Sequence, residues 1–69
     1  METEHAGSDR LSLRELEVLR LVEKGLAYDK IAANLLISTH TVKKHMMNIF
    51  QKLQVKNKVS ALRKAEHLF

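Results

Sequence analysis

The residues best suited to recognition chemistry lie in the stretch STHTVKKHMMNIFQKL, between Ser38 and Leu53. Apolar residues recur there at the spacing of one helical face, at Val42, Met46, Ile49 and Leu53. The opposite face carries hydrogen-bond donors and one soft apolar group, on His40, Lys43, Lys44, Met47 and Gln51. Lysine can donate to guanine O6 and N7, and glutamine can pair with adenine N6 and N7. We therefore expect these five residues to read base edges from a helix in the major groove of DNA.

The positive charge is concentrated in the same half of the chain. Residues 1–37 hold five Lys or Arg and seven Asp or Glu, a net charge of −2, whereas residues 38–69 hold seven and one, a net charge of +6. There is no acidic residue between Asp29 and Glu66. A half-chain this basic favours a polyanionic partner. The charge taken alone would fit an ordinary solvated surface equally well.

Other classes of function lack the residues they need. The sequence has no cysteine, so it offers no disulfide and no thiolate ligand for a metal. His40 and His45 are five positions apart, a spacing that does not place a metal-binding pair on one helical face. The sequence has no glycine-rich phosphate loop and no apolar run near the roughly 20 residues of a membrane span. We expect no enzymatic activity, cofactor, metal, small-molecule ligand or membrane partner.

Capping residues divide the chain into helices. Residues 1–10 are polar and are expected to form a lead-in or the stub of a linker. Ser12 and Glu15 have the spacing of a capping box, and Gly25 suits the end of the helix that follows. Ser38 and Asn57 are typical N-terminal caps for two later helices.

These signals predict an all-α, four-helix domain. The second helix is expected over residues 28–35, the third over 39–53, and the fourth from Asn57 to about Leu68. No Asn-Gly or Asp-Gly turn and no sustained alternation indicates a β-strand. A short helix, a tight connection at Leu36 and Ile37, and a longer amphipathic helix form the helix-turn-helix pattern.

The chain resembles the LuxR-type DNA-binding domain from Leu11 to about Ala65, and five ordered blocks carry the resemblance. The blocks are REXEVL at Arg14–Leu19, Gly25, IAXXL at Ile31–Leu35, ISXXTVKXH at Ile37–His45 and KLXVXN at Lys52–Asn57. The resemblance implies the output domain of a bacterial response regulator or quorum-sensing regulator, working on double-stranded DNA in the cytoplasm and nucleoid. It also implies that the third helix lies in the major groove.

Individual roles follow from the resemblance, position by position. Lys43, Lys44 and Met47 fall where members of the family face base edges. Phosphate contacts are implied around the start of the third helix and at the start of the fourth, at Thr39, Thr41, His45 and Lys58. Because Asn48 and Lys52 flank the expected reading face, we expect them to contact phosphates too.

Five positions depart from the family pattern, and one of them, Leu13, stands where proline is common. Ala27 and Tyr28 stand where a Ser-Asn type of pair usually opens the second helix, so a phosphate contact there would need the Tyr28 hydroxyl. Gln54 replaces a glycine, at a cost of roughly 1 kcal/mol if its backbone is left-handed. Met47 replaces a residue that is often polar, which points to contact with a thymine methyl group.

The last helix is expected to form a contact between two copies of the chain. We expect Leu62 and Phe69 to seal the core, which would leave a strip of small residues exposed. The sequence then predicts a weak symmetric homodimer through Ala61, Lys64, Ala65 and Leu68. The alternatives are that this strip covers the first helix or docks an upstream domain.

The sequence is also compatible with two other functions. The same fold could bind a protein, such as an RNA polymerase subunit or another regulator, and no longer bind DNA. A basic amphipathic helix could also lie on an anionic membrane, although the narrow apolar stripe of the third helix is needed by the core. The sequence contains no receiver or ligand-sensing domain, which fits either the output part of a larger regulator or a small stand-alone regulator.

Overall fold

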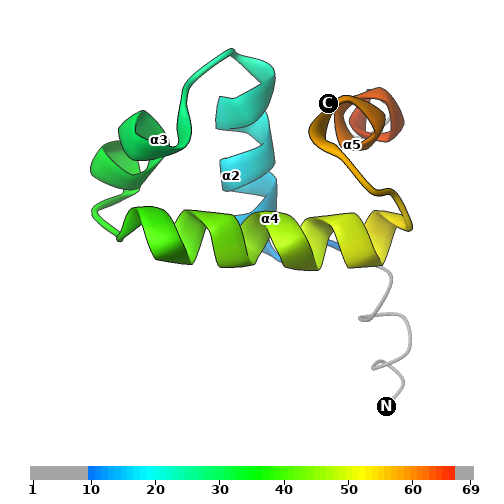
Figure 1. Cartoon of the computed structure of the whole chain (residues 1–69), viewed down its shortest axis with the longest axis horizontal. Coiled ribbons are helices and arrows are strands. Elements are labelled where there is room, and N and C mark those ends of the chain that lie inside the picture. Colours follow the sequence, from blue (N-terminus) through cyan, green and yellow to red (C-terminus); the bar gives the residue numbers. More distant parts are fainter. Residues whose placement is uncertain (1–9, 67–69) are drawn as a thin grey trace.

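The computed structural model describes residues 10–66, and these residues form four α-helices and no strand. The helices are α2 (Leu13–Glu23), α3 (Tyr28–Leu35), α4 (Thr39–Leu53) and α5 (Lys58–Ala65). In Figure 1, α4 lies along the lower edge of the molecule, with α2, α3 and α5 above it. Within residues 10–66, the predicted all-α class, the four helices and their order are confirmed. The last helix ends at Ala65, and Leu68 and Phe69 lie outside the described residues, as do residues 1–9 of the predicted lead-in.

Side-chain caps begin three of the helices, as the sequence predicts. Ser12 and Glu15 form a complete capping box: the Ser12 amide donates to Glu15 Oε1 at 2.9 Å, and the Glu15 amide donates to Ser12 Oγ at 3.1 Å. Ser38 Oγ accepts from the Thr41 amide at 3.0 Å, and Asn57 Oδ1 accepts from the Ser60 amide at 2.8 Å. Each bond satisfies an amide that the helix itself leaves without a partner.

Left-handed residues end two of the helices. Leu36 after α3 has φ 59° and ψ 44°, and Gln54 after α4 has φ 58° and ψ 48°. Each lets the chain turn back so that the next amide bonds a carbonyl five residues earlier, from Ile37 to Ala32 and from Val55 to Phe50, both at 2.9 Å. Gln54 thus has the left-handed backbone on which its expected cost depended, and Leu36, where nothing in the sequence indicated this conformation, has it too. A side chain with a Cβ adopts this conformation at a cost of about 1–2 kcal/mol.

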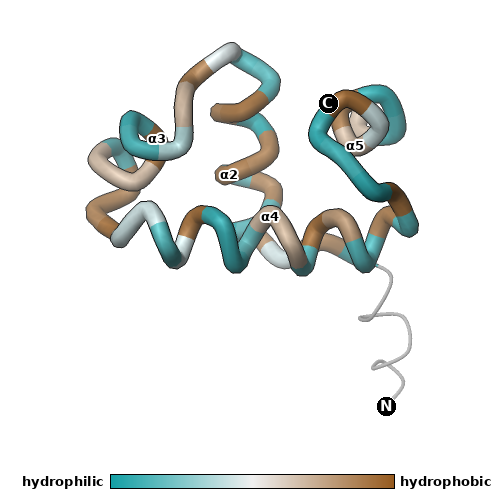
Figure 2. The backbone as a smooth tube through the Cα atoms, viewed as in Figure 1, coloured by the Kyte–Doolittle hydropathy of each residue, from teal (hydrophilic) through white to brown (hydrophobic). Residues whose placement is uncertain are grey.

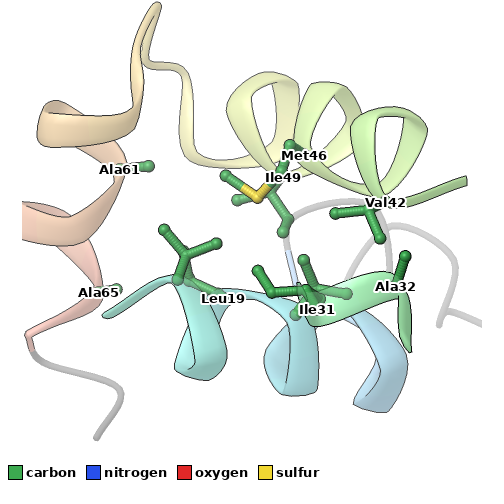
Figure 3. Packing of buried hydrophobic residues seen from close by; sticks show 10 residues of the cluster. Leu19, Ile31, Ala32, Val42, Met46, Ile49, Ala61 and Ala65 are labelled. Atoms are coloured by element: carbon green, nitrogen blue, oxygen red, sulfur yellow. The ribbon is translucent and has the colours of Figure 1, made fainter. Parts of the chain in front are cut away.

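The apolar stripe of α4 forms the centre of the core. Val42, Met46 and Ile49 are at most 1% exposed, as the spacing predicts. Figure 3 shows them pointing toward Leu19 of α2 and Ile31 of α3. Figure 2 shows the same division along the backbone, with α4 mostly hydrophobic on the edge toward α2 and α5 and mostly hydrophilic on the outer edge. Burial of one face of α4 is thus what holds the other three helices together.

The sequence-based account of the last helix was wrong about which side meets the core. Ala61 and Ala65, expected to be exposed, are 0% exposed, and Figure 3 shows both on the side of α5 that faces Leu19. Leu62, expected to seal the core, packs against it but is only half-buried. Because a methyl side chain lets two helices approach closely, the two alanines serve the contact between α5 and the rest of the domain. They are not available for the predicted homodimer contact.

Gln54→Gly is expected to raise the free energy of unfolding by about 1 kcal/mol, since glycine removes the Cβ penalty of the left-handed backbone. Chemical denaturation monitored by circular dichroism measures the change. Gly25→Ala is the reverse control: Gly25 has φ 93°, and a Cβ there would meet no atom within 4 Å, so any loss reports backbone strain alone. A stabilised Gly25→Ala or a destabilised Gln54→Gly would contradict this account.

Candidate nucleic-acid interface

The outer face of α4 presents all five residues expected to read bases. His40, Lys43, Lys44 and Gln51 are exposed, and Met47 is 64% exposed despite its apolar side chain. Within residues 10–66, none of these five makes an ion pair. The core residues Val42, Met46 and Ile49 occupy the other side of the same rod. Core packing therefore uses one face of α4, and the residues expected to read bases lie on the opposite face, so substitutions on the outer face leave the core contacts in place.

The start of α4 holds the residues expected beside phosphates. Thr39, Thr41 and His45 are half-buried, and Asn48 is exposed one turn further along. Thr41 is tied to the cap, since its Oγ1 lies 2.9 Å from Ser38 Oγ. The positive end of the helix dipole lies at this terminus and favours an anion by up to about 1 kcal/mol. The first turn is thus ordered by its own side chains and compatible with a phosphate neighbour.

Lys52, which was expected to contact a phosphate, pairs with a residue of α2. Its Nζ donates to Glu15 Oε1 at 2.8 Å, and the two side chains are 27% and 6% exposed, respectively. Because the ammonium is already paired with the buried carboxylate of α2, Lys52 is placed to connect α4 with α2. A bound phosphate would have to compete with that carboxylate for Lys52, which argues against the predicted phosphate contact.

The charged state of Glu15 is stabilised by its surroundings. Burial acts to raise its pKa, but hydrogen bonds from Lys52 and from the Ser12 amide, together with the positive charge of Lys52, outweigh burial and lower the pKa below its ordinary value of 4.5. Glu15 therefore both completes the cap of α2 and pairs with α4. This double role was not visible in the sequence, because the capping box predicts only the local partner.

Lys58 lies at the first position of α5 and is exposed. Its Nζ lies 5.9 Å from the centroid of the Tyr28 ring, within the range of a cation–π contact. Tyr28 is the first residue of α3 and is half-buried, and burial raises the pKa of its hydroxyl. Ala27 before it provides no side-chain cap. No sequence motif indicates the contact between Tyr28 and Lys58, because the two residues are far apart in the chain.

The other predicted residues of α5 are placed differently. Lys64 is exposed on α5, and its Nζ donates a hydrogen bond to the Leu53 carbonyl at 2.9 Å. This bond satisfies a carbonyl at the C-terminal end of α4, where a positive charge is favourable. Leu68 lies outside the described residues. The predicted dimer surface is thus reduced to the outward side of α5, without its two alanines.

The part of the chain that the structure describes holds no group of three His, Cys, Asp or Glu residues that could bind a metal ion. Among its helices, none is both long enough and apolar enough to cross a membrane.

Comparison with known proteins gives a consistent picture. Residues 9–65 match the model of the family described as bacterial regulatory proteins, luxR family. A nitrate/nitrite response regulator protein homolog of Haemophilus influenzae is 47% identical over 53 residues, which are 77% of this chain and 26% of that protein. The oxygen regulatory protein NreC of Staphylococcus carnosus is 48% identical over 48 residues, 70% of this chain and 22% of that protein. The CsgBAC operon transcriptional regulatory protein of Escherichia coli is 42% identical over 52 residues, 75% of this chain and 24% of that protein. The chain thus spans about a quarter of the length of these relatives.

Glu15→Gln is expected to lower the free energy of unfolding at neutral pH by roughly 1–3 kcal/mol, because it leaves the Lys52 ammonium without its charged partner. The lowered pKa of Glu15 means that the pair stabilises the wild type fully above about pH 4.5 and is lost as the pH falls through the lowered value. The difference between the two proteins should therefore shrink below that pH in denaturation measured as a function of pH.

Glu17→Gln is the matched control for this experiment. Glu17 lies on the same helix, but its side chain is exposed. Its Oε1 lies 3.6 Å from Arg14 Nε, so it too belongs to an ion pair. An exposed pair of this kind contributes at most about 1 kcal/mol. Equal losses in the two variants, or a difference from wild type that grows in acid, would contradict the proposed role of Glu15.

Proposed function

Because the chain belongs to the luxR family of bacterial regulatory proteins, a family of DNA-binding transcription regulators, we propose that α4 lies in the major groove of duplex DNA and reads base edges there. The observation that carries this proposal is the division of α4 into two faces. Val42, Met46 and Ile49 of its apolar stripe are buried, and its outer face is exposed and carries two adjacent lysines. A helix anchored in this way can enter the groove without losing its own packing.

We assign base reading to the outer face of α4, which consists of His40, Lys43, Lys44, Met47 and Gln51. Lys44 and Met47 lie one helical turn apart on this face, so they reach neighbouring base pairs. A lysine ammonium donates to guanine O6 or N7, but as a flexible point charge it discriminates less than the planar fork of arginine. Met47 has no hydrogen-bond donor, and its apolar end fits the methyl group of thymine.

Phosphate binding is assigned to the edges of that face. Thr39, Thr41, His45 and Asn48 lie at the beginning and along the flank of α4, and Lys58 begins α5. Such contacts fix the register of the protein on the duplex and contribute affinity without reading sequence. Lysine contacts add a salt-dependent term through the release of counterions.

This chain spans about a quarter of the length of its relatives. We propose that the chain is the output domain of a larger bacterial transcriptional regulator, which acts on the nucleoid in the cytoplasm. Two copies would bind related half-sites, and any self-contact through α5 would use its outward side. The alternative, in which this fold binds RNA polymerase or another protein and no longer touches DNA, predicts no salt-dependent affinity for duplex DNA.

Lys44→Ala is expected to weaken binding to the preferred duplex by roughly 1–3 kcal/mol and to relax base preference, whereas Lys58→Ala should weaken all sequences alike and lower the salt slope by about one. In-vitro selection would first identify the preferred duplex, and fluorescence anisotropy at several salt concentrations would then measure both variants. If the two variants lost the same affinity on preferred and random DNA, the division into base-reading and phosphate-binding lysines would be wrong.

The proposed contact of Met47 can be tested by changing the DNA alone. Replacing single thymines of the selected site with uracil removes one methyl group and leaves base pairing unchanged. At the contacted position this should weaken the wild type by roughly 1 kcal/mol, the value of about one buried methylene group. Met47→Ala should bind the thymine and uracil duplexes equally. A wild type indifferent to uracil at every position would refute the contact.

A further inference from the structure

We propose that Tyr28 is a positioning residue for DNA binding, because its ring holds the Lys58 ammonium in place to meet a phosphate. This inference rests on the proposed role of Lys58 as a phosphate contact. Tyr28 and Lys58 are the first residues of α3 and α5, and Lys58 Nζ lies 5.9 Å from the centroid of the Tyr28 ring. The pair therefore joins the beginnings of two helices that are distant in the sequence.

The ring is the fixed member of this pair. Tyr28 is half-buried and packs against the hydrophobic core, so its two side-chain torsions are restricted by its neighbours. Lys58 is exposed, and its four-carbon stem has many accessible conformations when nothing holds it. Because the core holds the ring in place, the contact restricts the conformations of the exposed ammonium group.

Lys58 differs from Lys52 and Lys64, whose ammonium groups donate hydrogen bonds within the protein. Lys52 donates to the Glu15 carboxylate, and Lys64 donates to the Leu53 carbonyl. Within residues 10–66, the Lys58 side chain makes a ring contact with Tyr28 and no hydrogen bond or ion pair. A ring attracts a cation through its quadrupole and accepts no conventional hydrogen bond from it. The ammonium keeps its full charge and its three donors for a phosphate oxygen.

This arrangement predicts a gain in DNA affinity from pre-organisation. A free lysine loses conformational freedom when it binds a phosphate, and that loss weakens binding. If the ring already restricts Lys58, less freedom remains to be lost. Removing the ring should therefore weaken DNA binding by about two- to fivefold, the range that corresponds to an exposed cation–π contact.

The experiment is a double-mutant cycle on the 69-residue chain with a random-sequence duplex, measured by fluorescence anisotropy. Tyr28→Leu removes the ring, Tyr28→Phe keeps it and removes only the hydroxyl, and Lys58→Ala removes the cation. We expect Tyr28→Leu to bind about two- to fivefold more weakly and Tyr28→Phe to bind like the wild type. In the Lys58→Ala background, Tyr28→Leu should cause no further loss. Lys24→Ala, at the end of α2, is the control for loss of one positive charge.

A second measurement separates positioning from stability. In the free protein, the ring current of Tyr28 should shift the ε-methylene proton resonances of Lys58 in NMR spectra. The shift should persist in Tyr28→Phe and disappear in Tyr28→Leu. If Tyr28→Leu impairs folding, Tyr28→Met retains an apolar side chain of similar size and replaces it in both measurements.

The possible outcomes distinguish this inference from the proposed function. If Lys58→Ala binds like Lys24→Ala, both the phosphate contact of Lys58 and the role of Tyr28 are overturned. If Lys58→Ala weakens binding but Tyr28→Leu does not, or if Tyr28→Leu strengthens binding, only the role of Tyr28 is overturned. Equal losses in Tyr28→Phe and Tyr28→Leu would show that the hydroxyl acts, and not the ring.

Discussion

Burial of the apolar stripe of α4 is the constraint on which the rest of the structure depends. Val42, Met46 and Ile49 contribute essentially no surface to solvent, and residues of α2, α3 and α5 surround them. A chain of 69 residues can build only one small core, so one helix has to provide its centre. Once that face is buried, the rotation of α4 about its own axis is fixed. The direction in which Lys44 and Met47 point is thus a consequence of packing on the other side.

Two polar contacts fix the position of this helix along its length. At the C-terminal end of α4, the Leu53 carbonyl accepts a hydrogen bond from Lys64 of α5. One residue earlier in α4, Lys52 donates to Glu15, which also caps α2. The buried carboxylate connects the start of one helix to the last turn of another, and partial exposure of Lys52 moderates the cost of desolvating the pair. Hydrophobic burial orients the face of α4, and these hydrogen bonds set its position relative to α2 and α5.

Local features of the sequence were sufficient to predict the helices, whereas contacts between helices were not. The caps at Ser12, Ser38 and Asn57 act within one turn, so their effect can be inferred from neighbouring residues. The stripe of α4 follows from its period alone. The side of α5 that faces the core could not be inferred in this way, because its apolar residues cover too wide an arc. Close approach to α2 selected the side with Ala61 and Ala65, and this depends on residues about forty positions away.

The same reasoning applies to the candidate interface and limits what can be concluded from charge. The residues on the outer face of α4 are exposed as predicted, although their individual roles remain proposals. Residues 38–69 have a net charge of +6. An argument from this charge alone assumes that every lysine is available to a polyanion. The structure separates these lysines by their partners: Lys52 is paired with a buried carboxylate, Lys64 bonds a carbonyl, and Lys58 contacts a ring. Of these three partners only the carboxylate cancels the positive charge, and only the ring accepts no conventional hydrogen bond from the ammonium. In the proposed complex, the domain would therefore neutralise fewer phosphates than its net charge suggests, because part of its positive charge serves the fold.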